Sequence, residues 1–387
     1  MISGDRFSAV YRITGSEKEA YGKAKDLCLE ETVEFPEELV PSGMISEQII
    51  GRIESFESIL FDSGLVKPNG LDQYRAVISY AIETTANELT QLLNVLFGNI
   101  SIKPGFYLEQ INLPQSSLEN FKGPRFGREG LRNWLEVQGR PLLFTALKPM
   151  GLSAGELAEM AYKLALGGID IIKDDHGLTN QCFAPFTDRV QLCAKAVQKA
   201  NEETGQNCIY VANVTAPSNE IFSRAKLARD AGARGLMVAP GLVGLDTMRQ
   251  LADDDGIALP VFSHPAFQGS YVTSRENGIS HYALFGQIAR LAGADATIYP
   301  NFGGRFSFSQ AECESITRGT AISMGHIKPI FPSPGGGMSL DRVPAMLQVY
   351  GPDVIFLIGG GLFKHGPDLV QNCQYFRRLA EMYLKDQ

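Results

Sequence analysis

Three polar residues, Lys173, Asp175 and His176, lie at or just beyond the end of the apolar run 169–175. Because side chains alternate along a strand, Lys173 and Asp175 would share one face, with Asp174 on the other, and His176 could turn back toward them. Asp175 offers the anionic oxygen that a cation such as Mg²⁺ prefers, whereas Lys173 could offer another only as a carbamate formed with CO2. An ordinary ion pair between Lys173 and its neighbouring aspartates explains the same spacing without a metal.

Two glycine triplets are candidates for binding a phosphate group: Gly335, Gly336 and Gly337, and Gly359, Gly360 and Gly361. Glycine lets backbone N–H groups approach an anion closely, and each triplet precedes a helical pattern whose N-terminus would add a favourable dipole. The alternative interpretation is a pair of tight turns.

Two further residues end apolar runs and could act on a bound substrate. Lys148, in Ala-Leu-Lys-Pro-Met-Gly-Leu-Ser, precedes a proline, and a lysine desolvated near a cation can act as a base. On its own it would be a solvated rim residue. His264, in Phe-Ser-His-Pro-Ala-Phe, is equally compatible with a hydrogen-bonded rim histidine. His281, His326 and His365 are interpreted as structural or surface residues.

The elements that would position these residues are eight short apolar runs at intervals of roughly 23 to 39 residues. They cover residues 141–147, 169–175, 208–214, 235–240, 258–264, 295–300, 327–334 and 354–361. Helical spacing between the runs favours a parallel sheet, and eight units in about 245 residues fit a closed (β/α)8 TIM barrel, although a doubly wound open sheet shows the same alternation. Active sites of such barrels gather at the C-terminal ends of the strands, where all the candidates lie.

The residues before the barrel read as a separate α+β domain. We expect a strand at 7–13, a helix at 17–29, a second helix near 71–84 and a further element at 92–102. The Gly- and Arg-rich segment 123–139 would join this domain to the barrel, so the predicted domains are residues 1–125 and 126–387.

Composition excludes several classes of partner. A net charge of −8 without a basic run disfavours nucleic acid, and no apolar stretch is long enough to span a membrane or resembles a signal peptide. The six cysteines form no CxxC pair, so we expect neither a zinc site nor disulfides, and a reducing, cytoplasmic location.

Three motifs occur together that resemble one family: Gly-Arg-Pro-Leu-Leu leading to Leu-Lys-Pro-Met-Gly-Leu-Ser (139–153), Gly-Gly-Ile-Asp-Ile-Ile-Lys-Asp-Asp (167–175), and the glycine triplets. In order and spacing they resemble the large chain of ribulose bisphosphate carboxylase, and in particular its non-carboxylating RuBisCO-like, form IV relatives. The resemblance covers nearly the whole chain and implies a ferredoxin-like N-terminal α+β domain before a TIM barrel.

The resemblance also implies roles for single residues. Lys173 matches the lysine that CO2 carbamylates, Asp175 matches a Mg²⁺ ligand, and Lys148 matches the base that enolises the substrate. A homodimer is implied as well, in which Asn99 and Glu30 of a second subunit complete each site. Glu31 is the alternative to Glu30, because the segment 33–36 departs from the family pattern.

Four departures argue against carboxylation. His176 stands where the family has a glutamate metal ligand, and Met150 replaces the second lysine of the Lys-Pro-Lys motif. Pro265, after His264, replaces a phosphate-binding arginine, and Arg305 is nearest to the position of the lysine that steadies the CO2 adduct. Histidine suits Mg²⁺ less well than a carboxylate, so weaker Mg²⁺ binding, another metal or a changed role are all open.

What remains is a site for enolising a phosphorylated ketose by metal-assisted proton abstraction, with Arg305 and the glycine triplets near the phosphate. The leading hypothesis is an isomerase or enolase of the 5-methylthioribulose-1-phosphate type. Asn99, where the diketone enolases of the family have a lysine, points away from that branch. The alternative is a decarboxylase or hydrolase of a 3-oxo sugar acid phosphate, such as 3-oxo-isoapionate 4-phosphate. A third hypothesis is a sugar-phosphate binding or regulatory protein without activity.

Overall fold

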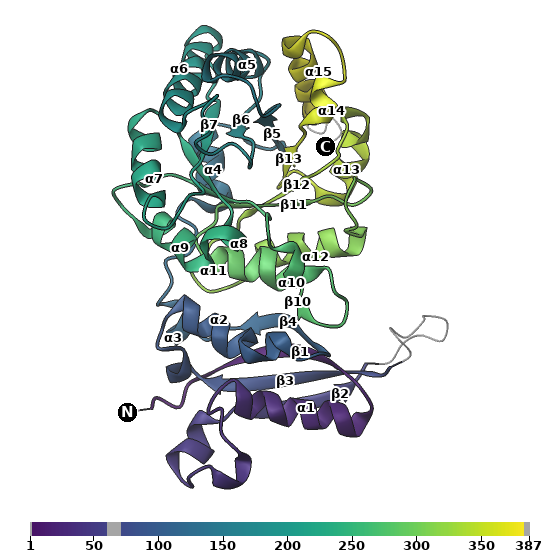
Figure 1. The fold of residues 1–387 in the computed structure, drawn as a ribbon. Coiled ribbons are helices and arrows are strands. Elements are labelled where there is room, and N and C mark those ends of the chain that lie inside the picture. Colours follow the sequence, from purple (N-terminus) through teal and green to yellow (C-terminus); the bar gives the residue numbers. More distant parts are fainter. Residues whose placement is uncertain (1, 60–70, 383–387) are drawn as a thin grey trace. The chain divides into compact units, whose positions relative to one another are not determined.

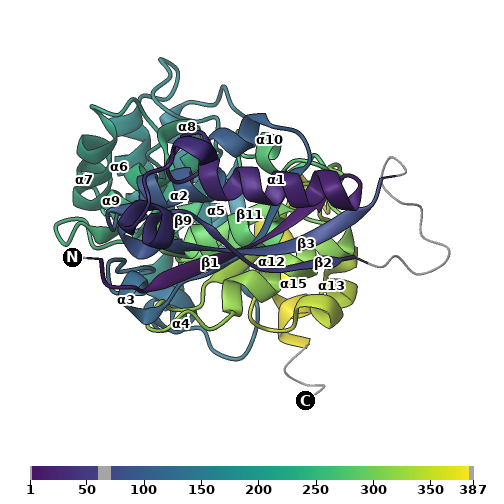
Figure 2. The same cartoon turned by 90° about the horizontal axis from the view of Figure 1, so that it is seen from below.

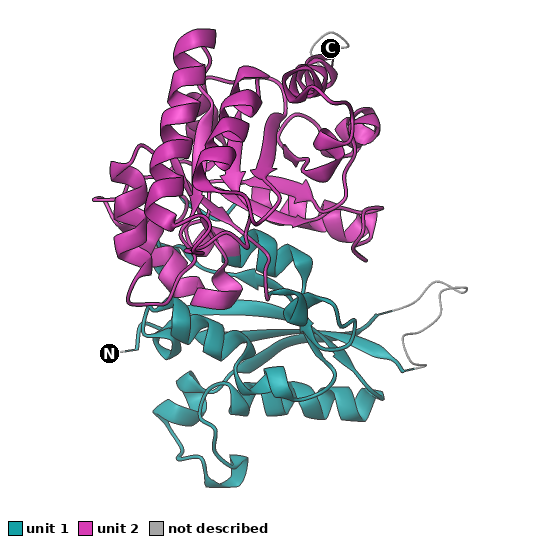
Figure 3. Cartoon of the chain, turned by 45° about the horizontal axis from the view of Figure 1, so that its top comes forward, with its two compact units in different colours: residues 1–122, 268–288, 323–327 teal, residues 123–267, 289–322, 328–387 magenta. Residues whose placement is uncertain are grey.

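A computed structural model describes residues 2–59 and 71–382. The chain divides into two compact units, shown in Figure 3. The sheet unit comprises Met1–Lys122, Gln268–Ile288 and Ser323–Ile327, and the barrel unit comprises Gly123–Phe267, Ala289–Ile322 and Lys328–Gln387. The domain boundary expected at 125/126 stays a prediction, since two later segments of the chain also join the sheet unit.

The sheet unit is built on a mixed five-stranded sheet in the order β10-β4-β1-β3-β2. Its strands are β1 (Arg6–Thr14), β2 (Arg52–Ser58), β3 (Gln73–Ala81), β4 (Phe106–Asn112) and β10 (Gly278–Ile279). Helix α1 (Glu17–Glu30) begins at a Ser16–Glu19 capping box and packs its buried residues, such as Leu27, against the sheet (Figures 1 and 2). Shorter helices are α2 (Leu89–Phe97), α3 (Gln115–Leu118), α10 (Gly269–Val272) and the 3₁₀ turn η5 (Asn99–Ile102).

The helix expected near residues 71–84 is wrong, because most of this segment is strand β3. β3 pairs antiparallel with β1 on one side and β2 on the other, so it is a central strand whose two faces are both largely buried. Its apolar residues therefore do not alternate strictly with polar ones, and Ala76, Val77 and Tyr80 happen to follow a helical spacing. The β-branched and aromatic residues of the segment were the better signal.

The barrel unit confirms the predicted (β/α)8 architecture. Its parallel strands follow the order β12-β11-β9-β8-β7-β6-β5-β13, and β12 contacts β13 to close the barrel (Figure 1). The strands are shorter than the apolar runs: β5 (Leu142–Leu147), β6 (Ile171–Asp174), β7 (Ile209–Asn213), β8 (Gly235–Val238), β9 (Val261–Ser263), β11 (Ala296–Pro300), β12 (Phe331–Gly335) and β13 (Ile355–Leu357).

The interior of the barrel is a packed core. Inward-facing side chains of the strands, among them Phe144, Ile171, Val211 and Phe262, form one cluster with residues such as Leu131 of helix α4 (Gly127–Leu135). Because this core fills the inside of the barrel, we expect a substrate to bind at the C-terminal ends of the strands.

Helices surround the barrel strands: α5 (Ala154–Leu166), α6 (Phe186–Thr204), α7 (Ile221–Asp230), α8 (Pro240–Val243), α9 (Leu245–Asp253), α11 (Ala289–Leu291), α12 (Gln310–Ala321), α13 (Val343–Tyr350), α14 (Gly360–Phe363) and α15 (Leu369–Met382). Serine capping boxes begin α5 and α12. Over the described part of the chain, none of the helices has the length and apolar character that crossing a bilayer would require.

Candidate active site at the mouth of the barrel

Lys173 is placed inside the barrel by the alternation of β6. Ile171 belongs to the barrel core, so Lys173 and Asp175, two and four residues later, face the same side. Lys173 is only 2% exposed, and its Nζ donates to the carbonyl oxygen of Asp174 at 3.0 Å. Burial lowers the pKa of Lys173 to about 8, against the opposing charge of Asp175. A substantial fraction of its amine is therefore neutral near pH 8, which is the form that can react with CO2.

Asp174 faces the opposite side of β6 and has a structural role. Its carboxylate pairs with Arg189 of α6 at 3.2 Å and accepts hydrogen bonds from the Tyr210 hydroxyl at 2.7 Å and the Asn213 backbone N–H at 3.0 Å. All of these groups are buried. The sequence analysis did not single out Arg189. It lies on the buried face of α6 with Phe186, three residues earlier. A charged residue on such a face indicates a buried partner of opposite charge.

Asp175 contacts Lys148, which follows the neighbouring strand β5, at the mouth of the barrel. Lys148 Nζ lies 2.9 Å from Asp175 Oδ1, and His176 Nδ1 lies 3.4 Å from the same oxygen. Burial would raise the pKa of Asp175, but His176, Lys148 and the charge of Lys173 hold that pKa well below its usual range. The spacing expected from the sequence thus brings two lysines and a carboxylate together.

His176 and His264 form a stacked pair from two different strand ends. Their ring centroids are 4.5 Å apart, with an angle of 12° between the rings. Burial and the charge of Lys173 lower the pKa of His264 well below its ordinary value, so this imidazole is neutral at pH 7. Its Nδ1 accepts from the Ala266 N–H at 3.2 Å, which leaves the proton on Nε2.

The donors at this mouth fit a divalent cation on one condition. Asp175 Oδ1 is a buried anionic oxygen whose near neighbours are the Lys148 amine and the His176 ring, so a cation bound there would share or replace the contact with Lys148. No group of three His, Cys, Asp or Glu side chains in the described ranges converges on one point, however. The set Asp175, His176 and Lys173 is therefore complete only if Lys173 carries a carbamate.

Asn213, at the end of β7, fixes the loop that carries His176. Its Nδ2 donates to the carbonyl oxygens of His176 and Leu178, each at 2.9 Å, and its Oδ1 accepts from the Thr215 N–H at 3.1 Å. The sequence places Asn213 at a strand end but gives no signal of this contact, which joins residues 35 to 37 positions apart.

The two glycine triplets differ in the space around them. A Cβ atom at Gly359 or Gly360 would meet nothing within 4 Å, whereas at Gly336 it would meet the Phe306 ring at 2.8 Å and at Gly337 the Arg305 backbone nitrogen at 2.9 Å. At Gly335 it would meet Leu357. The backbone at Gly359 and Gly360 is thus open to a ligand, whereas Gly361 is packed against Met338 and the triplet after β12 lies against the loop that carries Arg305.

Asn99 and Glu30 meet in the sheet unit. Asn99 Nδ2 donates to Glu30 Oε1 at 3.2 Å, and Lys103 Nζ binds Glu30 Oε2 at 2.8 Å, which lowers the pKa of Glu30. Glu31, the alternative, is buried and accepts from the backbone N–H groups of Gly98 and Ile100 at 3.1 and 2.7 Å. Glu31 therefore supports the turn around Asn99, and Glu30 is the carboxylate that remains partly accessible.

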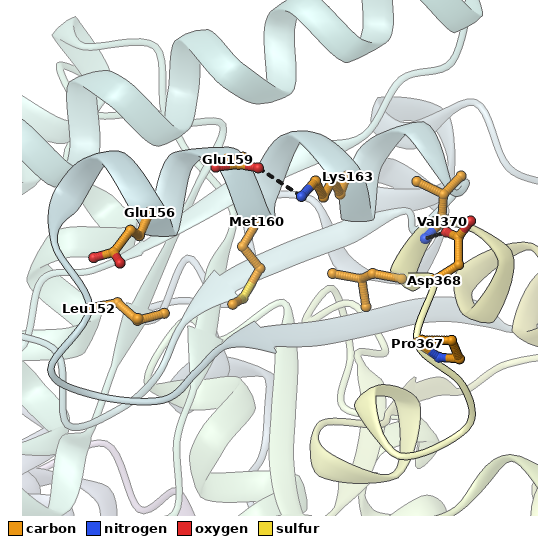
Figure 4. Close-up of a pocket in the computed structure, with 9 residues that line it drawn as sticks. Leu152, Glu156, Glu159, Met160, Lys163, Pro367, Asp368 and Val370 are labelled. Atoms are coloured by element: carbon orange, nitrogen blue, oxygen red, sulfur yellow. Dashed lines mark hydrogen bonds and ion pairs between the residues drawn. The ribbon is translucent and has the colours of Figure 1, made fainter.

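A hollow of about 620 Å³ lies between α5 and the start of α15 and contains none of the predicted site residues. Figure 4 shows its lining, in which Lys163 pairs with Glu159 at 2.7 Å and Asp368 caps α15. Its charged groups are engaged in this ion pair and in helix caps, so the converging side chains at the barrel mouth are the better candidate for chemistry.

Comparisons with known proteins show the family of the chain. The family model of the ribulose bisphosphate carboxylase large chain, catalytic domain, matches residues 127–387. The chain is 35% identical to the 5-methylthioribulose-1-phosphate isomerase of Rhodospirillum rubrum, over 96% of this chain and 95% of that protein. The crystal structure of the RuBisCO-like protein from Rhodopseudomonas palustris matches with a TM-score of 0.85 and 35% identity, covering 98% of both chains. The dimeric archaeal RuBisCO from Hyperthermus butylicus matches with a TM-score of 0.86 and 27% identity, over 99% of this chain and 92% of the other. The chain therefore belongs to the ribulose bisphosphate carboxylase large-chain family, as one of its RuBisCO-like proteins.

Proposed function

We propose that this RuBisCO-like protein enolises a phosphorylated ketose by metal-assisted proton abstraction, and that its reaction is an isomerisation of the 5-methylthioribulose-1-phosphate type. The observation that carries the proposal is the meeting of Lys148, Lys173 and Asp175 at the ends of two adjacent strands. The name of the Rhodospirillum rubrum relative supports the choice of substrate.

Lys148 is the proposed base. It is more accessible than Lys173, with a side-chain exposure of 37%, and Asp175 holds its Nζ at the mouth of the barrel. In its neutral form the amine removes a proton from the carbon next to the substrate carbonyl, and a protonated group nearby returns a proton to the adjacent carbon. The carbonyl and hydroxyl positions are thereby exchanged without net redox change.

Asp175, His176 and a carbamylated Lys173 would hold the divalent cation, with Mg²⁺ expected from the family resemblance. When bound, the cation would polarise the substrate carbonyl and lower the energy of the negative charge that develops on it. The low exposure of Lys173 and its pKa of about 8 support carbamate formation at that side chain. His264, neutral and with its proton on Nε2, can donate a hydrogen bond to a substrate oxygen.

The phosphate group of the substrate would bind the open backbone at Gly359 and Gly360, together with Arg305 and the triplet Gly335, Gly336 and Gly337. Carboxylation is not part of the proposal. Met150, Pro265 and Arg305 stand where the family's carboxylases have residues for CO2 addition or for the second phosphate.

We further propose a homodimer in which Glu30 and Asn99 of one subunit complete the site of the other. The hydrogen bond between these two side chains and the dimeric state named for the Hyperthermus butylicus relative support it.

The test is incubation of the protein with Mg²⁺ and bicarbonate in D2O and observation of 5-methylthioribulose 1-phosphate by NMR and mass spectrometry. Deuterium uptake with a rearranged product is expected. Release of CO2 from a 3-oxo sugar acid phosphate, with no change in the thio sugar, would favour the decarboxylase, because loss of CO2 passes through the same kind of enediolate. Tight binding of the ketose phosphate with no exchange of hydrogen would indicate a binding protein.

A further inference from the structure

The loop after β11, residues 301–309, is anchored where it leaves the barrel. The Asn301 N–H donates to the Gly335 carbonyl at 2.8 Å, and the Tyr350 hydroxyl of α13 donates to Asn301 Oδ1 at 2.7 Å. Asn301 Nδ2 in turn donates to the Phe302 carbonyl at 3.0 Å. Both Asn301 and Tyr350 are buried, so the first residue of the loop is fixed.

Arg342 holds the next part of the same loop. It comes from the short turn before α13, and its Nη1 donates to the Gly303 carbonyl at 2.6 Å, while its guanidinium lies 5.9 Å from the Phe302 ring centre. Gly303 has φ +64°, and a Cβ atom there would lie 2.6 Å from Arg342 Nη2. The guanidinium thus lies directly against a stretch of loop backbone whose positive φ favours glycine.

The residues just after this contact lie on the glycine triplet of β12. The Arg305 N–H donates to the Gly336 carbonyl at 3.2 Å, and a Cβ atom at Gly304 would lie 2.6 Å from that same oxygen. The Phe306 ring covers the α-carbon of Gly336. The turn that Arg342 contacts at Gly303 therefore leads directly into the backbone that lies on the triplet.

We infer that Arg342 is a positioning residue, which holds the β11 loop so that Arg305 is ready to bind a phosphate group beside the glycine triplet. The ligand part of this inference rests on the proposed function, whereas the loop contact does not. Arg342 acts through Gly303 and Phe302, and its Nη1 is already engaged with the loop.

The test compares Arg342→Ala, Arg342→Lys and the matched control Arg378→Ala with the unsubstituted protein. Arg378 is an exposed arginine of α15 that lies at the same 5.9 Å from an aromatic ring, Tyr375, without contacting the loop. Hydrogen–deuterium exchange of residues 301–308 should rise several-fold in Arg342→Ala, remain unchanged in Arg378→Ala, and be intermediate in Arg342→Lys.

Binding of inorganic phosphate, measured by calorimetry, separates positioning from direct contact. Arg342→Ala should weaken it roughly tenfold. The double variant Arg305→Ala/Arg342→Ala should bind phosphate no more weakly than Arg305→Ala alone. Once the Arg305 side chain is absent, Arg342 has no phosphate-binding group left to position. Additive losses, or unchanged exchange of the loop, would overturn the inference. If no ketose phosphate is turned over while the loop and the phosphate affinity respond as expected, the proposed reaction fails and the positioning role stands.

Discussion

Two neighbouring aspartates, at and just beyond the end of β6, differ in what their carboxylates contact. Asp174 is fully buried against Arg189 and Tyr210, whereas Asp175 faces the mouth of the barrel and the amine of Lys148. Removing one charge of a buried ion pair leaves the other without compensation, which is strongly destabilising. The partner of Asp175, Lys148, is partly exposed and can be solvated after the carboxylate is removed, so the loss there is smaller.

Substitution Asp174→Asn should therefore lower the free energy of unfolding by about 3–5 kcal/mol. The matched substitution Asp175→Asn removes a partly exposed ion-paired carboxylate, so it should lower the free energy of unfolding by less than Asp174→Asn does, and it should abolish the metal-dependent activity. Urea unfolding of both variants measures the first effect and calorimetric titration with Mg²⁺ the second. Equal destabilisation by the two substitutions would contradict the division of roles.

Glu31 gives a stability that depends on pH. Burial raises its pKa to about 7, against the two backbone N–H groups that favour the charged form, while the unfolded chain has the ordinary, lower value. Over the pH range between these values the folded protein binds more protons, so the contribution of Glu31 to stability is largest below the unfolded pKa and decreases as the pH rises toward 7.

Glu31→Gln does not titrate, so it should gain stability relative to the unsubstituted protein between pH 5 and pH 8. Urea unfolding at both pH values measures it, and Glu119→Gln, on the exposed surface of the same unit, is the control. The opposite trend would mean that the bonds from Gly98 and Ile100 outweigh burial and hold the pKa of Glu31 below normal.

At the scale of elements, the end of one strand fixes the loop that follows its neighbour. Asn213 of β7 binds the carbonyl oxygens of His176 and Leu178, beyond β6. Asn201 makes two similar side-chain bonds to the backbone of Cys208, just before β7, at the other end of the barrel. Asn201 therefore stabilises the barrel away from the site, whereas Asn213 stabilises the loop that carries His176.

Asn213→Ala should weaken binding of Mn²⁺, used as a spectroscopic substitute for Mg²⁺, by roughly 10- to 100-fold, which is typical for groups that orient metal ligands. Asn201→Ala should leave the Mn²⁺ affinity within about twofold of that of the unsubstituted protein. It should lower the free energy of unfolding about as much as Asn213→Ala does, because each substitution removes two side-chain hydrogen bonds to the backbone. Electron paramagnetic resonance titration measures both. If Asn201→Ala weakens binding as much, the loss comes from general destabilisation.

The sequence predicts best the elements whose surroundings restrict their length and composition, such as the barrel strands. A strand buried on both faces in a parallel barrel must be short and apolar, and all eight were found, with ends shifted by up to four residues. The prediction of a helix at 71–84 was wrong because β3 is buried by its contacts with β1 and β2. β1 is distant from β3 along the chain, and a local sequence pattern carries no information on such a contact.

At the scale of the whole molecule, the proposed site needs residues from two subunits. Lys148 belongs to the barrel unit, and Glu30 and Asn99 belong to the sheet unit. The family resemblance predicts both groups and leaves Glu30 and Glu31 as alternatives. In the structure the Glu31 carboxylate is bound by the backbone N–H groups of Gly98 and Ile100, which favours Glu30 for the site. The partners of Arg189 and Asn213 could not be predicted from the sequence, because tertiary contacts determine them.

Mixing of two inactive variants tests the shared site. Lys148→Met and Asn99→Ala should each lose activity, and re-forming dimers from an equal mixture should restore about a quarter of it, because half of the dimers are hybrids with one intact site. Steady-state assays before and after mild unfolding and refolding of the mixture measure this. No recovery, with hybrids demonstrated by mass spectrometry, would show that each site is made by one subunit.

The central claim is that Lys148 removes the proton, and the exchange of substrate hydrogen with solvent tests it most directly. The unsubstituted protein, Lys148→Met and the control Lys163→Met, whose lysine pairs with Glu159 on the exposed surface of α5, are incubated with 5-methylthioribulose 1-phosphate, Mg²⁺ and bicarbonate in D2O. NMR should show deuterium uptake with the unsubstituted protein and with Lys163→Met, and none above background with Lys148→Met. Unchanged uptake with Lys148→Met would contradict the account.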